Sequence, residues 1–226
     1  MEIEDIIDVN PFNKIVLKYK EPILLPRTIP LDCVYKILSY AYSQMNTAMI
    51  ISQQETVLRD IVVLELLFST GMRVSEISHI KLTDIDLMGN TIRILGKGAK
   101  ERIICISNKD VNSLIGEYIL KRKYSLDYLF VNRLGKRLSE QSIRNMVNKY
   151  ASAVDAPLHI TPHMFRHTFA TALHDEDVDI QYIQQFLGHS SITTTQIYSH
   201  ISTNKMRSIL EIKHPRNKVT FNSDSI

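Results

Sequence analysis

The chain has 226 residues, of which 44% are hydrophobic and 23% are charged, and its formal net charge is +3. This balance is typical of a soluble globular protein with one principal domain, and no apolar run is long enough to cross a membrane. Two cysteines, Cys33 and Cys105, and no signal peptide indicate a cytoplasmic protein without a disulfide framework.

The charge is unevenly distributed along the chain. From Arg93 to Lys149 there are 13 Lys or Arg against 5 Asp or Glu. Such a basic block is expected for a protein with a polyanionic partner, and nucleic acid is the usual one. The alternative from charge alone is a solvated charged face.

The first half of the chain reads as a linker followed by helices. Residues 1–26 contain three prolines and no sustained periodicity, which is typical of a linker. Apolar residues at helical spacing follow Pro30. The segment ETVLRDIVVLELLFST is apolar nearly all round and predicts a buried central helix that ends at Gly71. A short helix, RVSEISHI, is expected directly after that turn.

A change of period then predicts a small sheet. The β-branched segments TIRIL (91–95) and RIICIS (102–107) flank GKGAKE and predict a hairpin, to which IDL adds a third strand. Helices are expected to resume at about 110–122 and 140–154, the second of them capped by Ser139.

Three further helices are expected in the last third of the chain. Thr161 offers an N-cap before a proline at the first helical position, and Asp179 caps IQYIQQFL, which Gly188 closes. A last helix follows Thr203. The predicted fold is mainly α with a small antiparallel three-stranded β-sheet (α+β). The last helix carries an apolar stripe made of Met206, Ile209, Leu210 and Ile212.

Two histidines and an arginine stand close together in HMFRHTFAT. His163 and Arg166 are three residues apart and share a helix face. His163 and His167 have the spacing of a zinc-binding HExxH helix, but position 164 is Met, and no cluster of further ligands has recognisable spacing. We therefore expect no metal and interpret His167 as a packing or supporting histidine.

Two other motifs are weak when taken singly. GKG at 96–98 does not fit a phosphate-binding P-loop, because Gly98 stands where Ser or Thr should follow Lys97. Arg73 follows a helix-ending Thr-Gly at the start of the next helix, a place that favours an anion, and Glu76 is placed to hold its guanidinium. The alternatives are a solvated lysine and a surface ion pair.

The stretch FLGHSSITTTQIYSH, residues 186–200, puts Tyr198 on a polar segment nine residues after His189. Three consecutive threonines make a poor core helix, because β-branched side chains lose rotamer freedom there. Taken alone, the stretch fits a surface tyrosine.

Taken together and in this order, TGMRVSEI, the GKGAKER hairpin, HMFRHTFAT and LGHSSITTTQIYSH resemble the catalytic domain of the tyrosine recombinases, the phage-integrase and Xer-like superfamily. The resemblance runs from about Pro26 to Ile212. It implies a site-specific DNA recombinase or integrase that works through a 3′-phosphotyrosyl intermediate, without ATP, metal or other cofactor.

The resemblance also assigns the site. The matching catalytic positions are Arg73, Lys97, His163, Arg166, His189 and Tyr198. Glu76 matches an acidic position that braces the first arginine. Tyrosine has a pKa near 10, so Tyr198 needs a base, for which His163 is the candidate.

The charge that develops in the reaction needs its own partners. Arg73 and Arg166 can bind the non-bridging phosphate oxygens in bidentate fashion, and His189 adds a hydrogen bond. Lys97 is the candidate acid for the leaving 5′-oxygen.

Domains and partners follow from the same resemblance. Residues 1–26 are interpreted as the connection to an absent DNA-clamping domain, residues 27–212 as the catalytic domain and 213–226 as a flexible tail. The partner is double-stranded DNA, on which a mostly monomeric free chain forms a synaptic tetramer through the helix from Thr203 to Ile212. A type IB topoisomerase-like relaxase and a non-catalytic DNA-binding module are the alternatives.

Overall fold

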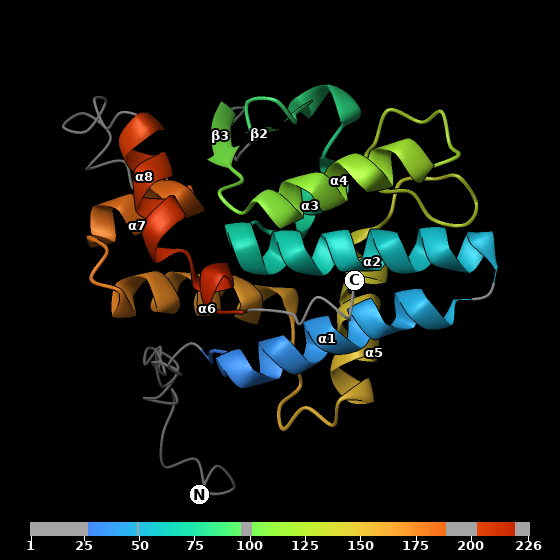
Figure 1. The fold of residues 1–226 in the computed structure, drawn as a ribbon, viewed down its shortest axis with the longest axis horizontal. Helices are drawn as coiled ribbons and strands as arrows, with labels where there is room; N and C mark the ends of the chain where they lie inside the picture. Colours follow the sequence, from blue (N-terminus) through green and yellow to red (C-terminus); the bar gives the residue numbers. More distant parts are fainter. Residues whose placement is uncertain (1–26, 49, 96–100, 189–202, 220–226) are drawn as a thin grey trace, which may run out of the picture.

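The helices of the protein are arranged around one central helix. The computed structural model describes residues 27–48, 50–95, 101–188 and 203–219. The central helix α2 (Ile51–Thr70) runs between α1 (Leu31–Thr47) on one side and α4 (Lys109–Lys121) on the other (Figure 1). It also packs against α6 (Pro162–Asp175).

The position of α2 follows from its composition. Nearly every residue from Leu58 to Thr70 is buried, because a helix that is apolar all round can be accommodated only inside the core. The helix ends at Gly71, whose φ of 60° is in the left-handed region. A Cβ at this position would lie 2.6 Å from Cδ1 of Phe169, so both backbone conformation and space require glycine. The sharp turn leads directly into α3 (Val74–His79).

The predicted sheet forms with the predicted topology. Strands β1 (Ile85–Asp86), β2 (Thr91–Leu95) and β3 (Glu101–Cys105) are antiparallel in the order β1-β2-β3. Residues Thr91 and Cys105 face each other at one end of the β2–β3 ladder, and Leu95 and Glu101 at the other. Residues 96–100, which separate β2 from β3 in the sequence, lie outside the described part.

The caps of the later helices are largely those predicted. The Ser139 hydroxyl accepts a hydrogen bond from the Ser142 amide (3.1 Å), and the Asp179 carboxylate accepts one from the Gln181 amide (2.8 Å). Thr161 occupies the expected N-cap position, but its hydroxyl makes no capping hydrogen bond. The mainly helical class with one three-stranded antiparallel sheet is confirmed. The remaining helices are α5 (Glu140–Ala153), α7 (Ile180–Leu187) and α8 (Thr203–Lys213).

The chain after α8 differs from the expectation of a flexible tail starting at residue 213. The short 3-10 helix η4 (Pro215–Lys218) returns to α2, where Arg216 forms two hydrogen bonds with Glu65 (2.8 and 3.0 Å). His214 bonds the Ser69 carbonyl, and burial lowers the pKa of its imidazole to about 4. Four residues of this segment are thus buried, His214, Pro215, Arg216 and Val219, and His214 and Arg216 supply partners for polar groups that α2 buries. Residues 220–226 lie outside the described part.

The face of α8 that carries the apolar stripe packs on its own domain. Met206 and Leu210 are buried in a cluster with Phe169 of α6 and Phe186 of α7. Ile212 is 78% exposed and takes no part in this cluster. Among the described helices, none combines the length and apolarity needed to cross a bilayer.

Candidate active site

Arg73 and Glu76 form the pair that the sequence predicted, at the junction of α2 and α3. The Glu76 carboxylate accepts hydrogen bonds from the Arg73 backbone amide (2.8 Å) and from its guanidinium Nη1 (3.1 Å). The Arg73 side chain is 40% exposed, whereas that of Glu76 is 6% exposed. A buried carboxylate therefore holds an arginine whose guanidinium remains open to a ligand.

Arg102 on β3 is a member of the site that the sequence analysis missed. Its two terminal nitrogens donate to the two carboxylate oxygens of Glu76, at 2.7 and 2.9 Å. Burial opposes the ionisation of Glu76, but the hydrogen bonds from Arg102 and from the Arg73 amide outweigh it and lower the pKa of this carboxyl. A signal was present in the sequence: strand alternation puts Arg102 on the same face as the buried Ile104.

Arg166 of α6 is the most deeply buried arginine of the predicted set, with 4% of the residue exposed. Its Nη1 donates to the Gly71 carbonyl (2.8 Å) and its Nη2 to the Leu187 carbonyl (2.6 Å), at the C-terminal ends of α2 and α7. These are carbonyls that helix ends leave without an intrahelical partner. Arg166 thereby joins the Arg73 turn to the end of α7, which precedes His189.

The arginines are close enough to influence one another. Burial, and then the positive charge of Arg73, lower the pKa of Arg166 to about 10; the charge of Glu76 opposes this shift, and that of Arg102 adds a smaller lowering. Two guanidinium groups, those of Arg73 and Arg102, thus contact one carboxylate, and Arg166 is close enough to feel their charges; the four side chains carry a combined charge of +2. Such a cluster can bind an anion with two phosphate-like oxygens.

His163 and His167 contact each other on the first turns of α6. Their Nε2 atoms are 2.8 Å apart, so one ring donates a hydrogen bond to the other. The two rings meet edge to face. Burial, then the charges of His163 and Arg166, lower the pKa of His167. His163 itself is exposed. The prediction that His167 supports a neighbour is consistent with this contact, which orients the exposed His163 ring.

The other three predicted residues cannot be placed. Lys97, His189 and Tyr198 lie outside the described residues, so the structure brings together Arg73, Glu76, Arg166 and the two histidines of α6 only. Within the described part of the chain, no group of three or more His, Cys, Asp or Glu side chains forms a candidate metal site.

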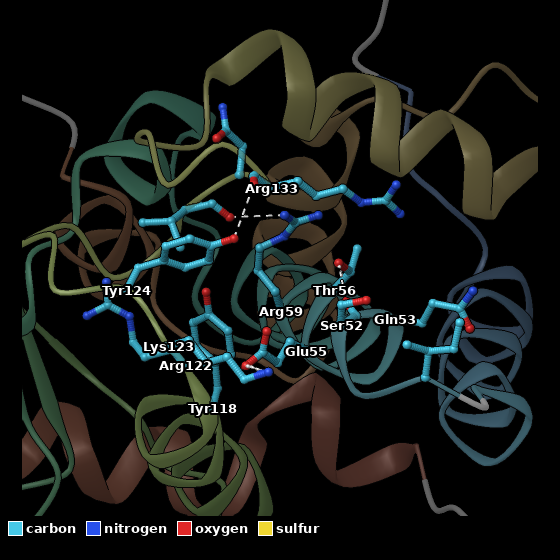
Figure 2. Close-up of a pocket in the computed structure, with 13 residues that line it drawn as sticks. Ser52, Gln53, Glu55, Thr56, Arg59, Tyr118, Arg122, Lys123, Tyr124 and Arg133 are labelled. Carbon is cyan, nitrogen blue, oxygen red and sulfur yellow. Dashed lines mark hydrogen bonds and ion pairs between the residues drawn. The ribbon is translucent and has the colours of Figure 1, made fainter.

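A separate cavity of about 300 Å³ lies at the far end of α2 and is not the candidate site. It is bounded by the start of α2, the end of α4 and the segment around Arg133 (Figure 2). Two of its polar side chains donate to backbone carbonyls of other lining residues: Arg59 to the Val131 carbonyl, and Tyr124 to the Arg133 carbonyl. The cavity lies away from Gly71 and Arg73, which are at the opposite end of α2.

The comparison with known proteins decides the family. A sequence profile described as "Phage integrase family" matches residues 39–205. The chain belongs to the phage integrase family.

The similar proteins are tyrosine recombinases. The chain is 49% identical to a tyrosine recombinase of Agathobacter rectalis over 98% of the chain and 73% of that protein. It is 36% identical to tyrosine recombinase XerC of Bacillus subtilis over 94% of the chain and 69% of that protein. The crystal structure of XerA recombinase is similar with a TM-score of 0.63 and 30% identity, over 84% of this chain and 65% of that one.

A further solved relative extends the comparison to a DNA complex. XerH site-specific recombinase bound to a palindromic difH substrate has a TM-score of 0.63 and 27% identity over 84% of this chain and 54% of that one. The protein is thus a tyrosine-type site-specific recombinase, and the relatives do not favour the topoisomerase-like or non-catalytic alternatives.

Proposed function

We propose that the recombinase breaks and rejoins double-stranded DNA with Tyr198 as nucleophile and the cluster of Arg73 and Arg166 as the phosphate site. The observation that carries the proposal is the arginine cluster at the end of α2, where Arg73 and Arg102 share the buried Glu76 carboxylate and Arg166 adds a further positive charge. The DNA-bound XerH relative and the basic block between Arg93 and Lys149 support DNA as the partner.

In the proposed reaction the Tyr198 oxygen attacks the scissile phosphorus while its proton passes to His163. The bond between phosphorus and the 5′-oxygen breaks, and Lys97 gives a proton to that oxygen. The product is a 3′-phosphotyrosyl link, which a 5′-hydroxyl of a partner strand attacks in the rejoining step. Because the link stores the energy of the broken bond, the cycle needs no ATP, and the arginines supply the positive charge that a metal would otherwise provide.

The electrostatic part of the reaction falls to the arginines. Negative charge develops on the non-bridging oxygens in the transition state, and pre-oriented donors stabilise it without reorganisation. Arg73 is partly exposed and fixed by Glu76, and Arg166 is fixed by two backbone carbonyls. We propose that His189 contributes one more hydrogen bond to the same oxygens.

Replacing Tyr198 with Phe is expected to abolish the covalent protein–DNA adduct and to leave DNA affinity nearly unchanged, because only the nucleophilic oxygen is lost. The adduct is measured on a denaturing gel after incubation with a labelled, nicked suicide substrate. Tyr182→Phe on α7 is the matched control and should still form the adduct. An adduct in the Tyr198 variant would assign the nucleophile elsewhere.

We further propose that the protein assembles on DNA as a synaptic tetramer through α8. The helix follows α7 only after residues 189–202, and its exposed Ile212 offers apolar surface beside the stripe that packs on its own domain. The catalytic domain is proposed to span residues 27–219, because residues 214–219 return to α2, and to follow a linker from a DNA-clamping domain. Two free, buried cysteines are compatible with the proposed cytoplasmic location.

The assembly proposal is tested with Ile212→Glu rather than by deleting the C-terminus, because residues 214–219 belong to the core. We expect this variant to lose cooperative binding to a two-site DNA while it keeps its affinity for a single site. Ile180→Glu, at a residue that is 56% exposed on α7, is the control. Binding is measured by gel shift at several protein concentrations. An equal loss on both DNAs would contradict assembly through α8.

A further inference from the structure

Arg102 is the second residue of β3 and pairs with Ile94 of β2. It is 17% exposed, and its guanidinium lies between two parts of the site. On one side it donates to both oxygens of Glu76. On the other side it lies against Gly188, where a Cβ would be 2.8 Å from the Arg102 Cζ atom. Gly188 has a φ of 65°, so glycine is required there by conformation and by this close approach.

The Glu76 carboxylate is shared between Arg102 and Arg73. Its Oε1 accepts from Nη1 of Arg102 (2.7 Å) and from Nη1 of Arg73 (3.1 Å). Its Oε2 accepts from Nη2 of Arg102 (2.9 Å) and from the Arg73 amide (2.8 Å). Because a bidentate guanidinium fixes the plane of a carboxylate, Arg102 fixes the direction in which Glu76 holds Arg73.

The charge of Arg102 is already neutralised, so its contribution differs from that of Arg73. Two short hydrogen bonds pair it with a buried carboxylate, whereas the Arg73 guanidinium has one longer bond to that carboxylate and a 40% exposed side chain. The arrangement leaves Arg73 to meet a ligand and gives Arg102 the task of holding its support in place.

We propose that Arg102 is a positioning residue for strand cleavage, which orients the Arg73 guanidinium toward the scissile phosphate by fixing Glu76. The inference rests on the proposed function for the phosphate-binding role of Arg73. It assigns Arg102 to the side of the non-bridging oxygens, although the residue is close in sequence to Lys97, the proposed acid on the leaving-group side.

The first test is the rate of single-turnover cleavage at saturating DNA. We expect Arg102→Met to slow cleavage about 10- to 100-fold, by analogy with the loss seen when a residue that orients a metal ligand is removed. DNA affinity should change little. Arg102→Lys keeps a positive charge next to Glu76 and therefore serves as a control for misfolding of the Met variant. It cannot form the bidentate hydrogen bonds and should also cleave slowly. Lys36→Met, which removes an exposed cation of α1, is the control for charge loss.

Coupling to Arg73 distinguishes positioning from a general loss of stability. If Arg102 acts through Arg73, the variant with both Arg73→Ala and Arg102→Met should cleave about as slowly as Arg73→Ala alone. If the fold-losses in cleavage rate of the two single variants multiply in the double variant, the proposal is overturned.

Replacement of the 5′-bridging oxygen by sulfur separates the two sides of the reaction. A thiolate leaves without protonation, so the cleavage rate of Lys97→Ala should return toward that of the unsubstituted protein on this substrate. The cleavage rate of Arg102→Met should stay low. Recovery of Arg102→Met would show that the residue acts through the hairpin lysine, contrary to the proposal. If the proposed function is wrong, the adduct should persist in the Tyr198→Phe variant. The cleavage rates of the Arg73 and Arg102 variants could still be compared in that case.

Discussion

Replacing Arg166 with Ala or Lys is expected to slow DNA cleavage by about 10² to 10³, the loss typical when one donor to a developing oxyanion is removed. Arg166 also links two helix ends through the carbonyls of Gly71 and Leu187. A lysine presents a point charge in place of a planar fork, so it cannot bond both carbonyls and a phosphate in the same geometry.

The lysine variant should also become sensitive to pH. Burial and the neighbouring charges of Arg73 and Arg102 lower the pKa at this position, and lysine starts from about 10.4, well below arginine. The lysine should therefore be charged at low pH and lose its charge as the pH rises through its depressed pKa. Residual cleavage by Arg166→Lys should therefore fall as the pH rises toward the alkaline range, whereas Arg166→Ala should show no such added loss. A normal cleavage rate in Arg166→Lys would contradict the bidentate role.

Arg216→Met is expected to destabilise the fold by about 3–5 kcal/mol, the cost typical of breaking a buried ion pair from one side. It leaves Glu65, which is 0% exposed, as a buried carboxylate without its cation. Tyr42 still donates to this carboxylate (2.9 Å), but a single neutral hydrogen bond does not replace an ion pair. The free energy of unfolding is measured by urea titration.

The matched double variant shows whether the loss comes from the unpaired charge. Glu65→Met combined with Arg216→Met removes both charges, and apolar replacement of a buried pair is often close to neutral. We expect the double variant to be more stable than Arg216→Met alone. Lys121→Met, at the exposed pair with Glu117, should change stability by less than about 0.5 kcal/mol. If the two single losses simply add in the double variant, the unpaired charge is not the cause.

Local features of the fold could be predicted because they depend on residues close in sequence. The closing glycines at 71 and 188, the caps at Ser139 and Asp179, and the strands around GKGAKE follow from backbone geometry within a few positions. The Arg73–Glu76 pair belongs to the same class, since residues three apart face each other on a helix.

The sequence by itself therefore determined the helices and strands, the order of the family motifs and the residues that those motifs nominate for the site. What only the tertiary structure decided are the partners of the buried charges: Arg102 with Glu76, Arg166 with the Gly71 and Leu187 carbonyls, and Arg216 with Glu65. The last two link segments that are 95 and 151 residues apart along the chain. Such pairs cannot be predicted from the spacing of residues along the chain. A buried charge pairs with whichever partner the packing of distant helices brings within hydrogen-bond distance.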